Sequence, residues 1–258
     1  MRARPEDRPS AYKEVYERLY REVPWHAAND PSESADEEAY EDLWFRLHRP
    51  LMKDGDVLVD LGCGRGSLLR RFAGSVERCI GIDVADAMID FCRSDDTADV
   101  EFVVGSVVTP PLPPESADVV VSRQLMEHLH PDDVPEHLRA VRRLLRPGGR
   151  FIIETPNRLT GPWDISRRFS EEATGFHLRE YTIGELTTLL RDAGFRRVRS
   201  PAVPSRVLVK LGPLRSRAYV PGRLKGGLEK VLERLPQSRR RAIAPLFVLR
   251  DVVLVADR

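Results

Sequence analysis

The chain has 258 residues, a net charge of +1, 41% apolar residues and 31% charged residues. The length suits one α/β domain with a substantial core, and the composition excludes a disordered or fibrous protein. The small net charge gives no electrostatic indication of a nucleic-acid partner, and no apolar run reaches the roughly 18 residues of a membrane span. Cys63, Cys79 and Cys92 cannot all pair and form no CxxC, and the first residues lack the apolar core of a signal peptide. We therefore expect a reduced, cytoplasmic enzyme.

Two helices are predicted in the N-terminal segment, residues 1–52. Residues 11–23 and 40–52 each carry apolar side chains at helical spacing. Between them, residues 30–42 hold seven acidic residues and no basic one. That composition suits a solvated loop or the first turn of a helix.

The pattern of the predicted core, residues 53–200, is short apolar runs alternating with helical segments. Strands are predicted at 57–62, 77–84, 100–106, 117–122, 150–157 and 195–200. Near-continuous apolar strands separated by helices are typical of a parallel sheet that is covered on both faces. The order indicates an α/β fold with an open, doubly wound, mostly parallel sheet.

Two longer segments interrupt this pattern. The connection 158–181 is too long to be without a role in a compact domain. Residues 205–241 carry eleven basic and two acidic residues, and a further apolar run follows at 246–256. Because that run still has the composition of a strand, we interpret 205–241 as a helical insertion and residues 1–258 as a single domain.

The turn after the first strand, Asp60–Gly66, is the strongest functional signal. Its glycines are spaced GxGxG, which differs from the GxGxxG of dinucleotide-binding proteins. Glycines there allow a close approach to a ligand or, alternatively, only a tight turn. Asp83 ends the second strand, where a carboxylate can accept both hydroxyl hydrogens of a ribose or cap the next helix.

Four segments, VLVDLGCGRG, GIDVADAMI, ADVVVSRQLMEHL and LLRPGGRFIIETPN, follow one another within residues 40–200. Together they resemble the class I S-adenosylmethionine-dependent methyltransferases. The resemblance implies a Rossmann-like methyltransferase fold with seven strands, the last of them antiparallel, and a helical lid in the N-terminal segment. It also implies S-adenosylmethionine as cofactor and S-adenosylhomocysteine as product.

The resemblance assigns the methionine part of the cofactor to the glycine turn, the ribose to Asp83 and the adenine to Val84 and Met88. The family often has Gly-Asp after the third strand, whereas this chain has Gly105-Ser106, so a hydroxyl and the N–H of Val107 would replace the acid. The implied cofactor-binding residues are Asp60, Gly62, Cys63, Gly64, Gly66, Asp83, Val84, Met88, Ser106, Val107 and Ser122.

Transfer to a hydroxyl or amine requires a base, which should follow the fourth strand or lie in the lid. His128 is the first candidate and His177 the second, with Glu127 beside them; each could instead structure its loop. We expect His130 to face solvent and His137 to be inert.

A metal site is a competing interpretation. Small-RNA 2′-O-methyltransferases carry E-x-x-E-H after this strand, and this chain is similar with Gln124, Glu127, His128 and the later His177. One carboxylate is missing, and an amide oxygen brings no charge to a cation. A divalent metal is therefore not the favoured prediction.

The predicted function is methyl transfer to a small molecule, with a hydroxyl of a sugar, quinone precursor or natural product as acceptor. The alternatives are a metal-assisted O-methyltransferase acting on an RNA or sugar hydroxyl, a nicotinamide-dependent oxidoreductase, and a noncatalytic module that binds an adenosine nucleotide. The oligomeric state is left open. The side chains expected to shape the acceptor pocket, or only to pack the lid, are Tyr16, Tyr20, Trp25, His26, Trp163, Arg167, Arg168 and Phe169. The basic insertion 205–241 is either a contact for an anionic surface, such as a membrane, or a solvated face.

Overall fold

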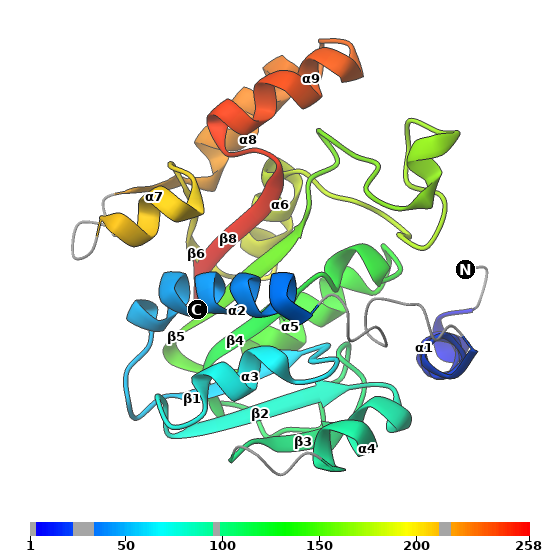
Figure 1. Cartoon of the computed structure of the whole chain (residues 1–258), viewed down its shortest axis with the longest axis vertical. Helices are drawn as coiled ribbons and strands as arrows, with labels where there is room; N and C mark the ends of the chain where they lie inside the picture. The colour runs from blue at the N-terminus through cyan, green and yellow to red at the C-terminus, as the bar shows by residue number, and fades with distance from the viewer. Residues whose placement is uncertain (1–3, 23–33, 95–98, 212–217) are drawn as a thin grey trace.

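The computed structural model describes residues 4–22, 34–94, 99–211 and 218–258. The strands in these ranges form one eight-stranded sheet with the order β3-β2-β1-β4-β5-β8-β6-β7 (Figure 1). The strands are β1 (Val57–Leu61), β2 (Arg78–Asp83), β3 (Glu101–Val104), β4 (Ala117–Arg123), β5 (Leu145–Pro156), β6 (Arg196–Pro201), β7 (Tyr219–Pro221) and β8 (Asp251–Asp257). None of the helices in the described ranges is long and apolar enough to cross a membrane.

The predicted doubly wound α/β sheet is confirmed. β3, β2, β1, β4 and β5 are parallel neighbours, and β8 runs antiparallel between β5 and β6. The strand order reverses between β1 and β4, which puts the crevice for a ligand at the carboxyl ends of these two strands.

The prediction of seven strands misses one. β7 is a three-residue edge strand inside the basic insertion, and it pairs antiparallel with β6. The last strand is also shorter than the predicted 246–256, because residues Ala244–Phe247 form a 3-10 turn and Val248 adopts a left-handed conformation with φ 56°. β8 therefore begins at Asp251.

Helices cover both faces of the sheet. One face packs against α2 (Ser34–His48), α3 (Ser67–Phe72) and α4 (Asp86–Ser94), and the other against α5 (Val134–Leu144) and α6 (Ile183–Asp192). The apolar residues of β1 divide accordingly, since Leu58 faces the first layer and Val59 and Leu61 face the second. Burial on both faces explains why the strands have near-continuous apolar sequences.

The insertion consists of α7 (Ser205–Lys210), β7, α8 (Gly222–Leu232) and α9 (Gln237–Ile243). α8 and α9 lie at the top of the molecule in Figure 1, whereas α7 lies lower, on the left. α8 packs closely on α6, where the Cα of Gly184 would lie only 2.6 Å from a Cβ added to Gly226.

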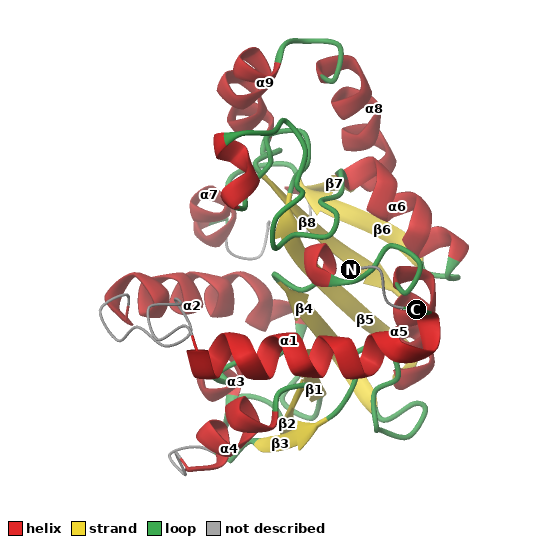
Figure 2. Ribbon diagram, turned by 90° about the vertical axis from the view of Figure 1, so that its right-hand side faces the viewer, coloured by secondary structure: helices red, strands yellow, loops and turns green. Residues whose placement is uncertain are grey.

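The N-terminal helix α1 (Arg8–Glu22) lies across the front of the molecule in Figure 2, over the carboxyl ends of the central strands. Hydrogen bonds hold it there: the Tyr12 hydroxyl donates to Asp133 at 2.8 Å and accepts from the N–H of His130 at 2.6 Å. At its other side, Lys13 forms an ion pair with Asp86 of α4 at 2.6 Å. α1 thus has the position that a lid requires.

Candidate active site

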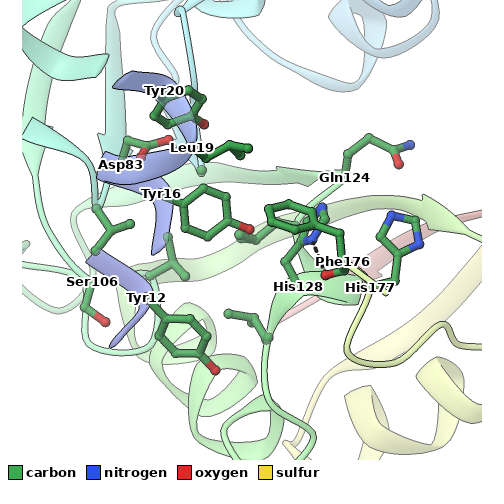
Figure 3. Close-up of a pocket in the computed structure, with 15 residues that line it drawn as sticks. Tyr12, Tyr16, Leu19, Tyr20, Asp83, Ser106, Gln124, His128, Phe176 and His177 are labelled. Carbon is green, nitrogen blue, oxygen red and sulfur yellow. Dashed lines mark hydrogen bonds between the residues drawn. The ribbon is translucent and has the colours of Figure 1, made fainter. Parts of the chain in front are cut away.

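A cavity of about 350 Å³ lies beneath α1 at the carboxyl ends of the strands (Figure 3). Three segments that are distant in the sequence enclose it: α1, the turns after β1 to β4, and the end of the connection 158–181. Its lining residues are Tyr12, Tyr16, Leu19, Tyr20, Gly62, Asp83, Val84, Ser106, Val107, Gln124, Leu125, His128, Leu129, Phe176 and His177. Seven residues predicted for the cofactor or for catalysis therefore meet in one cavity: Gly62, Asp83, Val84, Ser106, Val107, His128 and His177.

The glycine turn has the backbone that its sequence predicts. Gly62, Gly64 and Gly66 have φ values of 73°, 51° and 72°, in the left-handed region that other residues rarely adopt. A Cβ at Gly66 would lie 2.6 Å from the ring of Phe102, so this glycine allows close packing. A Cβ at Gly64 would meet nothing within 4 Å. Gly64, Gly66 and Cys63 lie behind the cavity wall, where they shape the turn.

The carboxylate of Asp83 joins the first two strand ends. Its Oδ2 accepts from the N–H of Gly64 at 3.1 Å, and its Oδ1 accepts from the N–H of Ala85 at 3.1 Å. Burial raises the pKa of Asp83, although these backbone donors counteract it. Each carboxylate oxygen can accept a second hydrogen bond. The capping and ribose-binding interpretations are therefore compatible at this residue.

Asp60 lies on the opposite face of β1 from Leu61, outside the lining of the cavity, and is buried. Burial raises the pKa of Asp60 to about 7, while the nearby guanidinium of Arg123 acts in the opposite direction. Arg123 itself pairs with Glu41 of α2 at 2.7 Å. This buried ion pair, which the sequence patterns did not reveal, attaches α2 to the end of β4.

The adenine end of the predicted site is supported from behind. Val84, Ser106 and Val107 line the cavity, whereas Met88 is buried outside its lining. His137 Nδ1 lies 2.7 Å from the backbone oxygen of Val107 and fixes this loop. Burial lowers the pKa of His137 to about 4, so this histidine is neutral at pH 7.

His137 thus has a structural contact with the loop at Val107, while the expectation that it takes no part in the chemistry stays a prediction. His130 is half-buried beneath α1 and does not simply face solvent, because its ring contacts Arg8. Ser122, another predicted cofactor residue, is buried outside the cavity lining, with no hydrogen-bond partner for its Oγ among the described residues.

His128 ends a 3-10 turn, Met126–His128, that follows β4. Its Nδ1 lies 3.3 Å from the backbone oxygen of Phe176, so the tautomer protonated at Nδ1 donates there and keeps Nε2 as an acceptor. The rings of Tyr16 and Phe176 pack edge-on against it at 6.2 and 5.0 Å between centroids. Figure 3 shows these three rings together at the centre of the cavity.

His177 is brought to the same place by the backbone of Glu127. The N–H groups of Leu178 and Arg179 donate to the carbonyl oxygen of Glu127 at 2.7 and 3.2 Å. The rings of His177 and His128 are then 5.0 Å apart between centroids. His177 Nδ1 lies 2.8 Å from Oε1 of Glu180, a residue that the sequence analysis missed although it follows His177 by three positions.

Two groups of this cluster, Glu127 and His177, have shifted pKa values. Burial raises the pKa of Glu127 to about 7; its Oε2 accepts from Thr155 Oγ1 at 2.8 Å, and its Oε1 has no hydrogen-bond partner among the described residues. Burial alone would lower the pKa of His177, but the hydrogen bond to Glu180 and the charges of Glu127 and Glu180 raise it overall. The cluster can therefore take up or release a proton near pH 7.

Glu127, His128 and His177 could also hold a metal ion. One ligand atom from each lies within 4.8 Å of the others. The hydrogen bond from His177 to Glu180 resembles the second contact that orients metal-binding histidines. Two imidazoles and one carboxylate suit zinc or a transition metal better than Mg²⁺ or Ca²⁺.

The other expected acceptor-pocket residues have mixed outcomes. Tyr16 and Tyr20 line the cavity, whereas Trp25 and His26 lie outside the described residues. Trp163 is stacked under the guanidinium of Arg250, outside the cavity lining. Phe169, Arg167 and Arg168 are exposed on the surface. For these three residues the structure favours the alternative of a solvated surface over a role in the pocket, because they lie outside the cavity lining that the connection reaches again at Phe176.

Comparisons with known proteins agree with this geometry. Residues 59–153 match the family model described as a methyltransferase domain. A protein of Mycolicibacterium smegmatis named as a "Probable S-adenosylmethionine-dependent methyltransferase" is 36% identical over 163 residues, 61% of this chain and 61% of that protein. The chain also matches a Mycobacterium tuberculosis relative, Rv3030, over 56% of that protein's length. The chain therefore spans only about six-tenths of the length of these relatives.

Solved structures show the same fold. A S-adenosylmethionine-dependent methyltransferase from Archaeoglobus fulgidus aligns with a TM-score of 0.57 and 20% identity, over 86% of this chain and 94% of that one. The strand order and the family match favour the methyltransferase hypothesis over a nicotinamide-dependent oxidoreductase.

Proposed function

We propose, from the methyltransferase-domain match of residues 59–153 and the relatives described above, that the chain is a class I S-adenosylmethionine-dependent methyltransferase that transfers a methyl group to a hydroxyl of a small molecule. The single observation that supports this proposal best is the composition of the cavity. The predicted ribose and adenine contacts line one end, and the proton-accepting groups His128 and His177 line the other.

The residues present fit the cofactor. Asp83 keeps acceptor capacity for the ribose hydroxyls, Gly62 exposes backbone to the cavity, and Ser106 and Val107 lie where the adenine edge would be. When bound, S-adenosylmethionine supplies an electrophilic methyl group on a sulfonium, so the chain's own residues need only align the acceptor and remove its proton.

The acceptor end has two routes for that proton. His128 lines the cavity, and in the tautomer protonated at Nδ1 its Nε2 is the basic nitrogen. His177 is linked through Nδ1 to Glu180, which would stabilise the imidazolium that forms when Nε2 takes a proton. The acceptor oxygen would then bond to the methyl carbon as the carbon–sulfur bond breaks, and its proton would pass to a histidine.

A hydroxyl acceptor is proposed because this end of the cavity combines bases with aromatic walls. The rings of Tyr16 and Phe176 lie 5.9 Å apart between centroids and flank His128. Aromatic walls favour a planar or largely apolar body, and an alcohol or phenol is the group that gains most from a nearby base.

Cofactor binding is tested by calorimetric titration of the purified chain with S-adenosylhomocysteine. We expect saturable binding that Asp83→Ala weakens by at least tenfold. Absence of heat and of any thermal shift with either S-adenosylmethionine or S-adenosylhomocysteine would exclude the proposal and leave only the fold.

The role of His128 is tested by labelled-methyl transfer into small-molecule fractions. His128→Ala should reduce turnover by about 10²–10⁴ while cofactor affinity is nearly unchanged. A loss of less than tenfold would remove His128 as the base and transfer the assignment to His177.

A metal-assisted transfer is a second candidate, favoured by the grouping of Glu127, His128 and His177 within 4.8 Å. A bound cation would lower the pKa of the acceptor hydroxyl. Turnover that survives exhaustive treatment with a chelator would exclude it.

A further inference from the structure

The outward face of α8 combines positive charge with exposed aliphatic side chains. One stripe of the helix is buried against the body of the protein and consists of Gly222, Lys225, Gly226, Glu229 and Leu232. The opposite stripe is exposed and consists of Arg223, Leu224, Gly227, Lys230 and Val231, and Arg234 in the turn after the helix is exposed as well. We call this second set, with Arg234 included, the α8 face. It lies at the end of the molecule remote from β3 (Figure 1).

No negative charge in the described part of the insertion points outward. Glu229 is buried, and it accepts hydrogen bonds from Asn157, Ile183 and Gly184 at 2.8–3.0 Å. Glu233 is half-buried and pairs with Arg158 at 2.8 Å. The three cations of the α8 face have no ion pair with any carboxylate that the structure describes, so their charge is directed to solvent.

Large apolar side chains are exposed on this end of the molecule. Leu224 and Val231 are 61% and 59% exposed and lie two helical turns apart on the α8 face. Leu246 and Phe247, in the turn that follows α9, are 78% and 45% exposed. This turn is attached to α8, because Lys225 Nζ donates to the carbonyl oxygen of Val248 at 2.8 Å.

We propose that the α8 face docks on an anionic lipid surface. Positive charge would attract acidic headgroups, and Leu224 and Val231 would enter the boundary between headgroups and acyl chains, as in helices that lie in the plane of a membrane. Phosphates of a nucleic acid would satisfy the arginines but would leave these aliphatic side chains without a partner. The combination therefore favours a bilayer over RNA.

The segment that carries the α8 face is hydrogen-bonded to the connection 158–181, which contributes Phe176 and His177 to the cavity. The insertion is bound to the start of the connection that carries His177: Arg241 donates to the carbonyl oxygens of Thr160 and Gly161 at 2.9 and 3.0 Å. Gln237 donates to Gly161 as well, at 2.7 Å. A membrane contact would consequently be made by a part of the chain that is hydrogen-bonded to the first residues of the connection 158–181.

The experiment is co-sedimentation of the full chain with vesicles. Vesicles of phosphatidylcholine containing about one-third phosphatidylglycerol are compared with pure phosphatidylcholine, at low and at high salt. We expect binding at least tenfold tighter to the anionic vesicles, and weaker at high salt. The triple variant Arg223→Ser, Lys230→Ser, Arg234→Ser should lose about 100-fold, since each cation near an anionic surface contributes about fivefold.

Two further variants separate charge from insertion. Leu224→Ser with Val231→Ser should weaken vesicle binding by about tenfold and keep its salt dependence. A matched charge control, Arg71→Ser, Arg78→Ser, Arg139→Ser, removes three exposed cations elsewhere and should stay within about threefold of the unmodified chain.

Three results would overturn the proposal. The first is that the chain binds both kinds of vesicle equally, or binds neither. The second is that the triple variant and its control lose binding equally, and the third is that the double variant of Leu224 and Val231 binds anionic vesicles as well as the unmodified chain. A titration with random-sequence RNA at the same salt completes the test: tighter binding to RNA than to vesicles would assign the face to nucleic acid instead.

Discussion

Replacing Glu127 by Gln tests the electrostatics of the site without any knowledge of the acceptor. The side chain is fully buried, and burial raises its pKa to about 7 from a usual value of 4.5. A carboxyl group with a raised folded-state pKa stabilises the fold in its protonated form, and that contribution is lost as the pH rises from about 4.5 to about 7. Glutamine has the same shape and does not titrate.

The expected effect follows from linkage. Between pH 5 and pH 8, ionisation of Glu127 should lower the free energy of unfolding of the unmodified chain by about 2.5 kcal/mol. The Glu127→Gln variant should not show this decrease. The variant should resemble the unmodified chain at pH 5 and be the more stable protein at pH 8. Urea unfolding curves at the two pH values measure the difference, and Glu171→Gln, at an exposed position, serves as the control.

The quantity to compare is the unfolding free energy of Glu127→Gln minus that of the unmodified chain. If this difference changes by less than about 0.5 kcal/mol between pH 5 and pH 8, a buried, titrating Glu127 is refuted. A difference of opposite sign, in which the variant loses stability relative to the unmodified chain as the pH rises, would also refute it. That result would mean that His177 stabilises the Glu127 anion more than burial destabilises it.

Three further predictions follow from local geometry. Glu180→Gln removes the carboxylate that raises the pKa of His177, so that pKa should fall; an NMR titration of the imidazole measures it, and an unchanged value would contradict the assignment. Gly66→Ala forces a Cβ against an aromatic ring at positive φ and should lower Tm by about 5–15 °C, more than Gly64→Ala, whose Cβ has open space; equal shifts in thermal unfolding would disprove the packing role. Tyr12→Phe removes two hydrogen bonds that hold α1, worth about 1–3 kcal/mol, so amides of α1 should exchange faster while those of the sheet do not; a uniform increase would argue against a lid.

The sequence patterns predicted the parts of the site that depend on neighbouring residues. The glycine turn and Asp83 could be placed because each lies at the end of an apolar strand, and the positive φ angles of the glycines follow from their spacing. His137 could have been recognised as buried, because it lies between Val134 and Leu138 on the apolar stripe of α5.

The patterns failed where tertiary contacts decide. The ion pair of Arg123 with Glu41 joins segments that no local pattern connects. β7 has only three residues, too few for an alternating pattern to be visible, and it is defined by its pairing with β6. The early part of 246–256 is apolar but carries a left-handed residue, Val248, which ends a turn there.

The cofactor end and the acceptor end of the cavity are therefore formed by different parts of the chain. The cofactor end is formed by turns within residues 59–153, the range that matches the methyltransferase family. The acceptor end is completed by Tyr16 of α1 and by Phe176 and His177, all outside that range. The carbonyl oxygen of Glu127, which accepts from Leu178, and the packing around His128 are among the contacts that connect the two. Changes in α1 or in 158–181 can thus alter the acceptor while the cofactor contacts persist, so a relative that shares only residues 59–153 need not share the acceptor.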